Sequence, residues 1–411
     1  MKNIQKSLYE YIKELEIIDT HEHLVCEKYR LERNIDIFTL MHLYEYVDMT
    51  SAGYKPRNGE NVFVNNLFTD ESVDIDEKWK RAWPHLQNIK YGSYYRPTKI
   101  LLKDLYGVDD LNETNYKEVS EKINNANKKG LYKRILRDKC NIKYSLVQNG
   151  TVTDQDPADI FVPLFADVNS YQLENDNFIR TLEKHFDSSI EDLDTYTSFL
   201  CSFMEEMKKL GAAGFKIASN YNVEPNIKEA SNSFKKVLKG EKADVNLQSA
   251  ILDSILKKAA ELDWPVAVHC GVWWDYRTVD PKNMIDLIQR HTNTRFDLYH
   301  LGIPDVRDTI FLGKNFPNVF LNLCWTYLVS QSITENAINE IIDTVPVNKI
   351  FAFGADSCWS IEQVYGHYII AAETLSRAFA KRIDQGLLEI DDAKHILKMW
   401  LYDNPVNFYK L

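Results

Sequence analysis

Short apolar runs that alternate with helix-like stretches constrain the fold of this chain more than any other feature. An opening strand at 17–24 is followed by seven such runs, at 142–147, 161–168, 213–218, 265–271, 296–302, 319–325 and 350–356. Near-continuous apolar strands that alternate with helices are typical of a buried parallel sheet. Eight βα units predict a (β/α)8 TIM barrel, with a doubly wound open sheet as the alternative.

The segment 25–140 interrupts this alternation. It is rich in aromatic and charged residues at helical spacing, among them the stretches 77–84 and 94–96. A connection this long carries secondary structure of its own. We therefore expect a barrel formed by residues 1–24 and 141–411, and a helical insertion, residues 25–140, that covers the barrel mouth.

Charge and cysteine distribution restrict the partners and the compartment. The net charge of −11 is spread along the chain and gives no basic patch, which argues against nucleic acid or an anionic membrane as partner. The six cysteines lie far apart, which fits a reducing compartment, and no stretch reaches the roughly 18 apolar residues of a membrane span. We expect a cytoplasmic protein with a small-molecule substrate; a homo-oligomer stays open.

The opening strand ends in two histidines, His21 and His23. Because side chains alternate between the two faces of a strand, Asp19 shares their face and Glu22 lies on the other. Neutral imidazole is the commonest metal ligand in proteins, so the pair is typical of half a transition-metal site. The alternative is a pair of ordinary surface histidines.

Ionisable residues also lie at the ends of other predicted strands. His269, His300 and Asp356 end three of them, and Lys216 lies in a fourth. Active sites of (β/α)8 barrels lie at the carboxyl ends of the strands, so these side chains are expected to converge on the histidine pair. The remaining six of the ten histidines fall in predicted helices or in the insertion.

Alternation along the strands places Lys216 and Asp356 inside the barrel. In the last strand it assigns Phe351 and Phe353 to the outer face and Ala352 to the inner one. An inward lysine or aspartate is costly unless it is paired, metal-bound or chemically modified. A structural Lys216–Asp356 ion pair is the alternative to a metal site.

With these residues the chain is similar to the amidohydrolase superfamily of metal-dependent hydrolases. The resemblance covers about 14–24 and 141–411 and consists of HEH at 21–23, Lys216, HCG at 269–271, YHLG at 299–302 and GADS at 354–357. Each motif is short, but their order and their positions in the strands are specific. The resemblance implies a (β/α)8 metalloenzyme.

The resemblance also implies a set of metal ligands, namely His21, His23, Lys216, His269, His300 and Asp356. The first two histidines and the aspartate would hold one ion, and the later histidines would hold a second ion or orient the substrate. Lys216 matches the position at which members with two metals carry a bridging carbamylated lysine. We expect one or two ions of zinc, with manganese, iron or nickel open because such mixed ligand sets accept several divalent ions.

Catalytic roles follow from the electrostatics of such a site. A bound divalent ion lowers the pKa of water towards neutrality. Asp356 would take the proton from the attacking water and pass it to the leaving group. His269 or His300, where not a ligand, would polarise the substrate oxygen. Asp19 is either an acceptor for an imidazole N–H or a buried structural aspartate.

Loops after the strands are expected to bind the substrate. The candidates are Arg277, Trp273, Trp274, Trp325 and Asn220. A guanidinium can hold a carboxylate or phosphate through two hydrogen bonds, and the aromatic residues suggest a ring-shaped or sugar-like substrate with an anionic end. The alternative for each aromatic residue is plain packing.

Three functions are therefore weighed. The first is a metal-dependent hydrolase that cleaves an amide, ester or related bond in a small, anionic substrate. The second is an aldose–ketose isomerase, because a large helical insertion after the first strand resembles the uronate isomerases; Lys216 departs from their pattern. The third is a non-catalytic metal-binding barrel, which needs a ligand shell without an open position.

Overall fold

The computed structural model describes residues 2–62, 65–148, 156–271 and 275–411. Its strands run parallel in two sheets, ordered β1-β2-β3 and β4-β5-β6-β7-β8. They are β1 (Ile17–Glu22), β2 (Ile142–Val147), β3 (Phe161–Pro163), β4 (Phe215–Ala218), β5 (Val266–His269), β6 (Phe296–Leu298), β7 (Val319–Asn322) and β8 (Ile350–Phe351). Each strand begins within two residues of a predicted run, so the predicted alternation is confirmed.

Backbone hydrogen bonds join the two sheets at both seams. The Lys216 N–H of β4 donates to the Phe165 carbonyl just beyond β3, at 2.9 Å. On the other side, the Thr20 N–H of β1 donates to the Phe353 carbonyl just beyond β8, at 3.0 Å. The fold is the predicted (β/α)8 barrel, and the open-sheet alternative is wrong.

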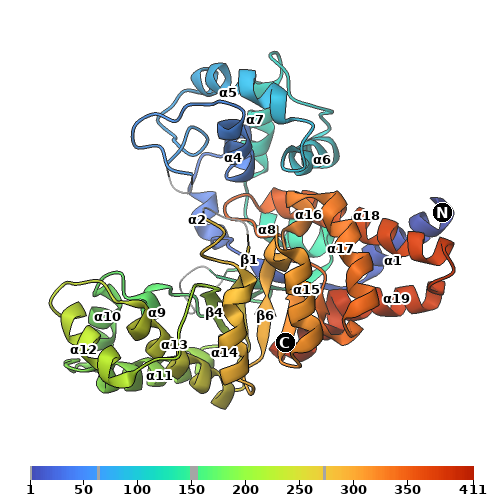
Figure 1. Cartoon of the computed structure of the whole chain (residues 1–411). Helices are drawn as coiled ribbons and strands as arrows, with labels where there is room; N and C mark the ends of the chain where they lie inside the picture. Colours follow the sequence, from blue (N-terminus) through green and yellow to red (C-terminus); the bar gives the residue numbers. More distant parts are fainter. Residues whose placement is uncertain (1, 63–64, 149–155, 272–274) are drawn as a thin grey trace.

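Helices surround the barrel (Figure 1). They are α1 (Lys2–Glu14), α9 (Asn169–Gln172), α10 (Asn177–Phe186), α11 (Leu193–Lys209), α12 (Ile227–Val237), α13 (Val245–Glu261), α14 (Ile285–Arg290), α15 (Val306–Asn315), α16 (Thr326–Val329), α17 (Gln331–Thr344), α18 (Ile361–Asp384), α19 (Ile390–Lys398) and α20 (Asn404–Tyr409). Most of them place buried apolar residues in one hydrophobic cluster with the strands, as α10 does with Phe178, Ile179 and Leu182. Among the described residues, no helix is long and apolar enough to cross a bilayer.

The segment after β1 folds into helices with a hydrophobic cluster of their own. They are α2 (Glu27–Leu31), α3 (Ile37–Leu40), α4 (Tyr44–Ser51), α5 (Ile75–Ile89), α6 (Tyr95–Tyr106), α7 (Tyr116–Ala126) and α8 (Leu131–Lys133). Phe38, Phe68, Trp79 and Leu101 are buried in this cluster, and α4 to α7 form a lobe at one end of the barrel, where α6 packs against α18 (Figure 1). The division of the chain at residues 24 and 141 stays a prediction.

The barrel interior is apolar at its lower end. Phe351 packs there on Phe320, with ring centroids 5.9 Å apart, and on Phe408 of α20. Ala352 belongs instead to the cluster formed with the surrounding helices. The predicted outer position of Phe351 and inner position of Ala352 are therefore wrong, because regular pairing of β8 ends at Phe351 and strict alternation does not continue to Asp356.

Candidate metal centre

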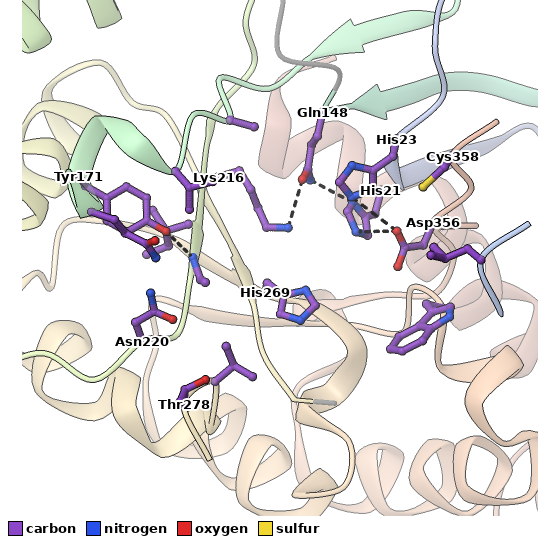
Figure 2. A pocket seen from close by; sticks show the side chains of 18 of the residues that line it. His21, His23, Gln148, Tyr171, Lys216, Asn220, His269, Thr278, Asp356 and Cys358 are labelled. Atoms are coloured by element: carbon purple, nitrogen blue, oxygen red, sulfur yellow. Dashed lines mark hydrogen bonds and ion pairs between the residues drawn. The ribbon is translucent and has the colours of Figure 1, made fainter. Parts of the chain in front are cut away.

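Two imidazoles and a carboxylate meet at the carboxyl end of β1. The Nε2 atoms of His21 and His23 lie 3.2 Å and 3.6 Å from Oδ1 of Asp356, which follows β8 (Figure 2). The Asp356 N–H donates to the His21 carbonyl at 2.9 Å, so the backbone itself holds the aspartate beside β1. The predicted convergence of these three residues from opposite ends of the sequence is what the structure shows.

His300 reaches the same carboxylate from the turn that follows β6. Its Nε2 lies 4.0 Å from Oδ2 of Asp356, and its Nδ1 lies 3.2 Å from the Cys324 carbonyl. His300, Trp325 and Asp356 all have positive φ, at 62°, 61° and 57°. A non-glycine residue in this region costs roughly 1–3 kcal/mol, a strain that clusters at functional sites.

The donor atoms fit a divalent ion. One ligand atom each of His21, His300 and Asp356 lies within 4.8 Å of the others. Two donors about 2.0–2.1 Å from a tetrahedral ion lie roughly 3.3 Å apart, close to the separations of the His21 and His23 nitrogens from Asp356. Imidazole nitrogen with carboxylate oxygen is a donor set that suits zinc and other transition metals.

Electrostatics keep these groups in their ligand forms. Burial lowers the pKa of His21, and it lowers the pKa of His300 to about 3, so both imidazoles are neutral at physiological pH. Burial acts to raise the pKa of Asp356, but the surrounding imidazoles, His21 first, outweigh it and hold that pKa well below its usual value. Asp356 is therefore an unprotonated carboxylate.

His269 follows β5 and lies on the other side of His300. Its Nδ1 is 3.2 Å from the His300 Nε2, and its ring lines the cavity described below. Burial, followed by the proximity of His300, lowers the pKa of His269 well below 6.5. A neutral imidazole at this position can donate one hydrogen bond to a substrate oxygen.

Asp19 binds backbone amides. Its Oδ1 accepts from the N–H groups of His21 and Ala355, at 3.3 Å and 3.2 Å, which supports its structural interpretation. Its carboxyl group also hydrogen-bonds to that of Glu22, and burial raises the pKa of Glu22 well above its usual value. The predicted opposite face for Glu22 is wrong because the β1–β2 register shifts between Asp19 and Glu22.

Lys216 lies in the wall of the site. Its Nζ donates to Oε1 of Gln148 at 3.1 Å and lies 4.6 Å from the centre of the Tyr299 ring. Desolvation in the barrel interior lowers the pKa of Lys216 to about 8. In the part of the chain that the structure describes, Lys216 makes no ion pair with Asp356.

Gln148 was not among the residues predicted from sequence. Its Nε2 lies 3.0 Å from Nδ1 of His21, so one amide side chain contacts both a candidate ligand and Lys216 (Figure 2). The only signal in the sequence was its position directly after the strand β2, which is where (β/α)8 barrels carry functional residues.

A cavity of about 740 Å³ opens beside the metal centre. Asn220 and Trp325 line it as predicted for substrate-binding residues, and Tyr44 and Tyr171 add walls that the sequence did not indicate. Tyr44 belongs to the helical lobe, and its hydroxyl donates to the Asp356 carbonyl at 2.5 Å. The lobe therefore contributes directly to the site.

One predicted substrate-binding residue, Arg277, is not among the described residues that line this cavity. The Arg277 side chain is 84% exposed and is held by Asp275, at 2.6 Å. Two hydrogen bonds to the Asp275 carboxylate, in the same loop, satisfy the guanidinium. Trp273 and Trp274 lie outside the described residues.

A (β/α)8 barrel with histidines after β1 and β6 and an aspartate after β8 defines the class of metal-dependent barrel enzymes. The chain belongs to the amidohydrolase family, whose model, Amidohydrolase, matches residues 18–411. The family membership agrees with the resemblance found from the motifs.

Solved structures share the fold across the whole chain. A uronate isomerase from Thermotoga maritima is 16% identical with a TM-score of 0.82, covering 99% of this chain and 97% of that one. A glucuronate isomerase from Caulobacter crescentus is 14% identical with a TM-score of 0.78, covering 100% and 94%. A Lactobacillus casei protein, provisionally assigned as a metal-dependent hydrolase, is 16% identical with a TM-score of 0.66, covering 98% and 97%. At these identities the likeness concerns the fold alone.

Among curated proteins, Protein fluG of Emericella nidulans is 22% identical over 167 residues. The match covers 38% of this chain and 18% of that protein. The chain therefore matches under a fifth of the length of this relative.

Proposed function

We propose that this protein is a metal-dependent hydrolase that cleaves an amide, ester or related bond in a small substrate. One observation carries the proposal: the unprotonated Asp356 carboxylate lies 3.2 Å and 3.6 Å from the His21 and His23 nitrogens and also lines the cavity. A carboxylate in this position can serve both as a ligand and as a general base towards a molecule bound in the cavity.

The residues that would hold the metal are His21, His23 and Asp356, a set of three that leaves a position of a four-coordinate ion open for water. His300, 4.0 Å from Asp356, is a further candidate ligand. When bound, a divalent ion, for which we propose zinc, lowers the pKa of water and polarises a substrate carbonyl. One ion satisfies this ligand set. The prediction of a second ion depends on Lys216, which in the structure donates to Gln148.

The side chains then have distinct roles in hydrolysis. Asp356 takes a proton from the attacking water and passes it to the leaving group. His269, neutral and facing the cavity, donates a hydrogen bond to the substrate carbonyl oxygen as negative charge develops there. Tyr44 and Trp325 exclude water from the reacting groups.

Carbamylation of Lys216, which the family resemblance implies, is the alternative to a free amine at this position. A carbamate would supply an oxygen ligand and support two ions. Intact mass spectrometry of metal-loaded protein, prepared with bicarbonate, tests it through an added mass of one CO₂ that disappears in Lys216→Met. An unmodified amine together with a single bound ion would leave the one-metal form.

Uronate isomerase is the second candidate. It is supported by the full-length likeness to two sugar-acid isomerases, which includes the helical lobe. In that reaction Asp356 would move a proton between adjacent carbons of a sugar acid instead of activating water.

Substrate assays separate the two candidates. Zinc- and manganese-loaded protein is incubated with a panel of small esters, amides and lactones, and in parallel with D-galacturonate and D-glucuronate. We expect hydrolysis of at least one panel member, abolished in Asp356→Asn. Ketose formation from either uronate, without hydrolysis, would contradict the first choice.

A further inference from the structure

One amide side chain connects the metal centre to Lys216. Gln148 Nε2 lies 3.0 Å from His21 Nδ1, and Gln148 Oε1 accepts from Lys216 Nζ at 3.1 Å. An amide NH₂ group only donates, so in this arrangement the His21 Nδ1 accepts. Gln148 is buried, and Figure 2 shows its side chain between the two partners.

A metal on His21 determines which atom of the Gln148 amide faces the ring. The His21 Nε2 faces Asp356 and is the nitrogen that would bind the ion. The neutral ring then carries its proton on Nδ1, and ligand histidines donate this second N–H to an oxygen acceptor. The atom opposite Nδ1 must therefore be an oxygen, and in the metal-bound protein this oxygen is Oε1 of Gln148.

The orientation of the Gln148 amide determines which of its groups faces Lys216. With Oε1 turned to His21, the Gln148 NH₂ group faces the Lys216 ammonium, and neither group can accept a hydrogen bond from the other. Lys216 has no carboxylate partner within 4.0 Å among the residues placed by the structure. Two buried donors without an acceptor are costly, so an oxygen anion is the ligand that stabilises them.

We propose that in the metal-bound protein the Gln148 amide turns its oxygen to His21 and its NH₂ group towards Lys216, and that this arrangement creates a subsite, between Gln148 and Lys216, that binds the carboxylate of the substrate. Both residues line the cavity, and Lys216 is the only lysine or arginine among the described residues that do. The inference rests on the proposed metal centre but not on which reaction follows. In this proposal Gln148 positions the His21 ring, and Lys216 selects substrates that carry a carboxylate.

The oxygen anion that the subsite binds can come from two sources. It can belong to the substrate, as proposed, or to a carbamate formed on Lys216 itself. A substrate carboxylate requires a free amine, whereas a carbamate places the oxygens on the lysine. The experiment therefore includes an arm for each source.

The first arm measures zinc affinity by competition with a chelator, with no substrate present. Gln148→Glu keeps an oxygen for the His21 N–H and is expected to bind zinc about as tightly as the unmodified protein, whereas Gln148→Leu loses the acceptor and binds about 10–100-fold more weakly. Lys216→Met is the matched control and keeps its zinc affinity. Equal affinity of Gln148→Leu and the unmodified protein would overturn the role of Gln148.

The second arm measures malonate and its neutral counterpart malonamide by calorimetry. Malonate is expected to bind the zinc-loaded protein at least about tenfold tighter than malonamide, since charge-assisted hydrogen bonds are the strong ones. This preference should fall in both Lys216→Met and Gln148→Glu, which still hold zinc. If Lys216→Met keeps the preference for malonate over malonamide, zinc alone binds the malonate, and the proposed subsite is wrong.

The third arm is ¹³C NMR of zinc-loaded protein in ¹³C-bicarbonate. No carbamate signal is expected. A carbamate carbon that disappears in Lys216→Met would assign the oxygens to the lysine and overturn the substrate carboxylate. If the unmodified protein binds no zinc, the proposed function itself is wrong. If it binds zinc, but the Gln148 and Lys216 variants keep its zinc affinity and its malonate preference, only this inference is wrong.

Discussion

At the residue scale, Asp356 is the group on which the site depends. Its carboxylate oxygens lie within 4.0 Å of the Nε2 atoms of three imidazoles. Its backbone N–H donates to the His21 carbonyl, and its backbone carbonyl accepts from the Tyr44 hydroxyl. The low pKa of its carboxyl comes from those imidazoles, which outweigh the effect of burial. Its charge is therefore present throughout the physiological pH range.

Replacing this carboxylate tests its role directly. Asp356→Asn keeps the shape but removes the charge and the base, so kcat/KM for any substrate found should fall by about 10²–10⁴-fold or more. The measurement is steady-state kinetics on protein shown by circular dichroism to be folded. Asp391→Asn, on the exposed side of α19, is the matched control. Activity within about twofold of the unmodified enzyme would contradict the assignment.

Residue identities at the site were partly predictable. His21, His23 and Asp356 carry the signal of short motifs at strand ends, and the structure brings them together. Gln148 and Tyr44 carry no such signal, because an amide or a phenol becomes functional only through what packs beside it. Arg277 shows the opposite case: a nearby aspartate in its own loop satisfies it.

At the element scale, the helical lobe is joined to the barrel by buried polar contacts. Arg30 of α2 forms an ion pair with Glu362 of α18 at 3.0 Å, with side chains 0% and 1% exposed. The Arg30 guanidinium also donates to the Trp359 carbonyl at 2.7 Å. This pair ties α2, which precedes the lobe in the chain, to the helix that follows the metal-binding aspartate.

Breaking this pair should be costly. Arg30→Met leaves the Glu362 carboxylate buried without its cation and should lower the free energy of unfolding by about 3–5 kcal/mol. Arg307→Met, which breaks the exposed Arg307–Glu340 pair, should cost less than about 1 kcal/mol. Urea denaturation compares the two. Equal losses would contradict the account of the lobe's attachment.

A second buried contact predicts a pH dependence of stability. Glu45 of α4 accepts hydrogen bonds from Thr98 of α6 and Gln363 of α18. Burial raises the pKa of Glu45 from 4.5 to about 8. Between these values the folded protein holds a proton that the unfolded chain has released, so the stabilisation present below pH 4.5 is lost as the pH rises through about 8.

Glu45→Gln removes this dependence. The amide stays neutral at every pH and can still accept from Thr98, so the variant should gain stability relative to the unmodified protein as the pH rises from 5 to 8. Thermal unfolding at a series of pH values measures it, with the exposed Glu118→Gln as control. Parallel curves for Glu45→Gln and the unmodified protein would refute the raised pKa.

At the scale of the whole molecule, the barrel could be predicted because hydrophobic alternation is a property of the sequence itself. Each strand begins near its predicted run, but strict alternation fails where pairing stops, as at Phe351, or where the register shifts, as at Glu22. The packing of the lobe against the barrel could not be predicted, since it depends on contacts between residues hundreds of positions apart, such as Arg30 with Glu362.

The central claim is a single metal centre at the carboxyl end of the barrel. Elemental analysis of protein purified without chelator, compared with a His21→Ala/His23→Ala variant, tests it most directly. We predict about one equivalent of zinc or a similar divalent metal in the unmodified protein, and loss of that metal in the variant. Less than about a tenth of an equivalent, with no gain on reconstitution, would contradict the account.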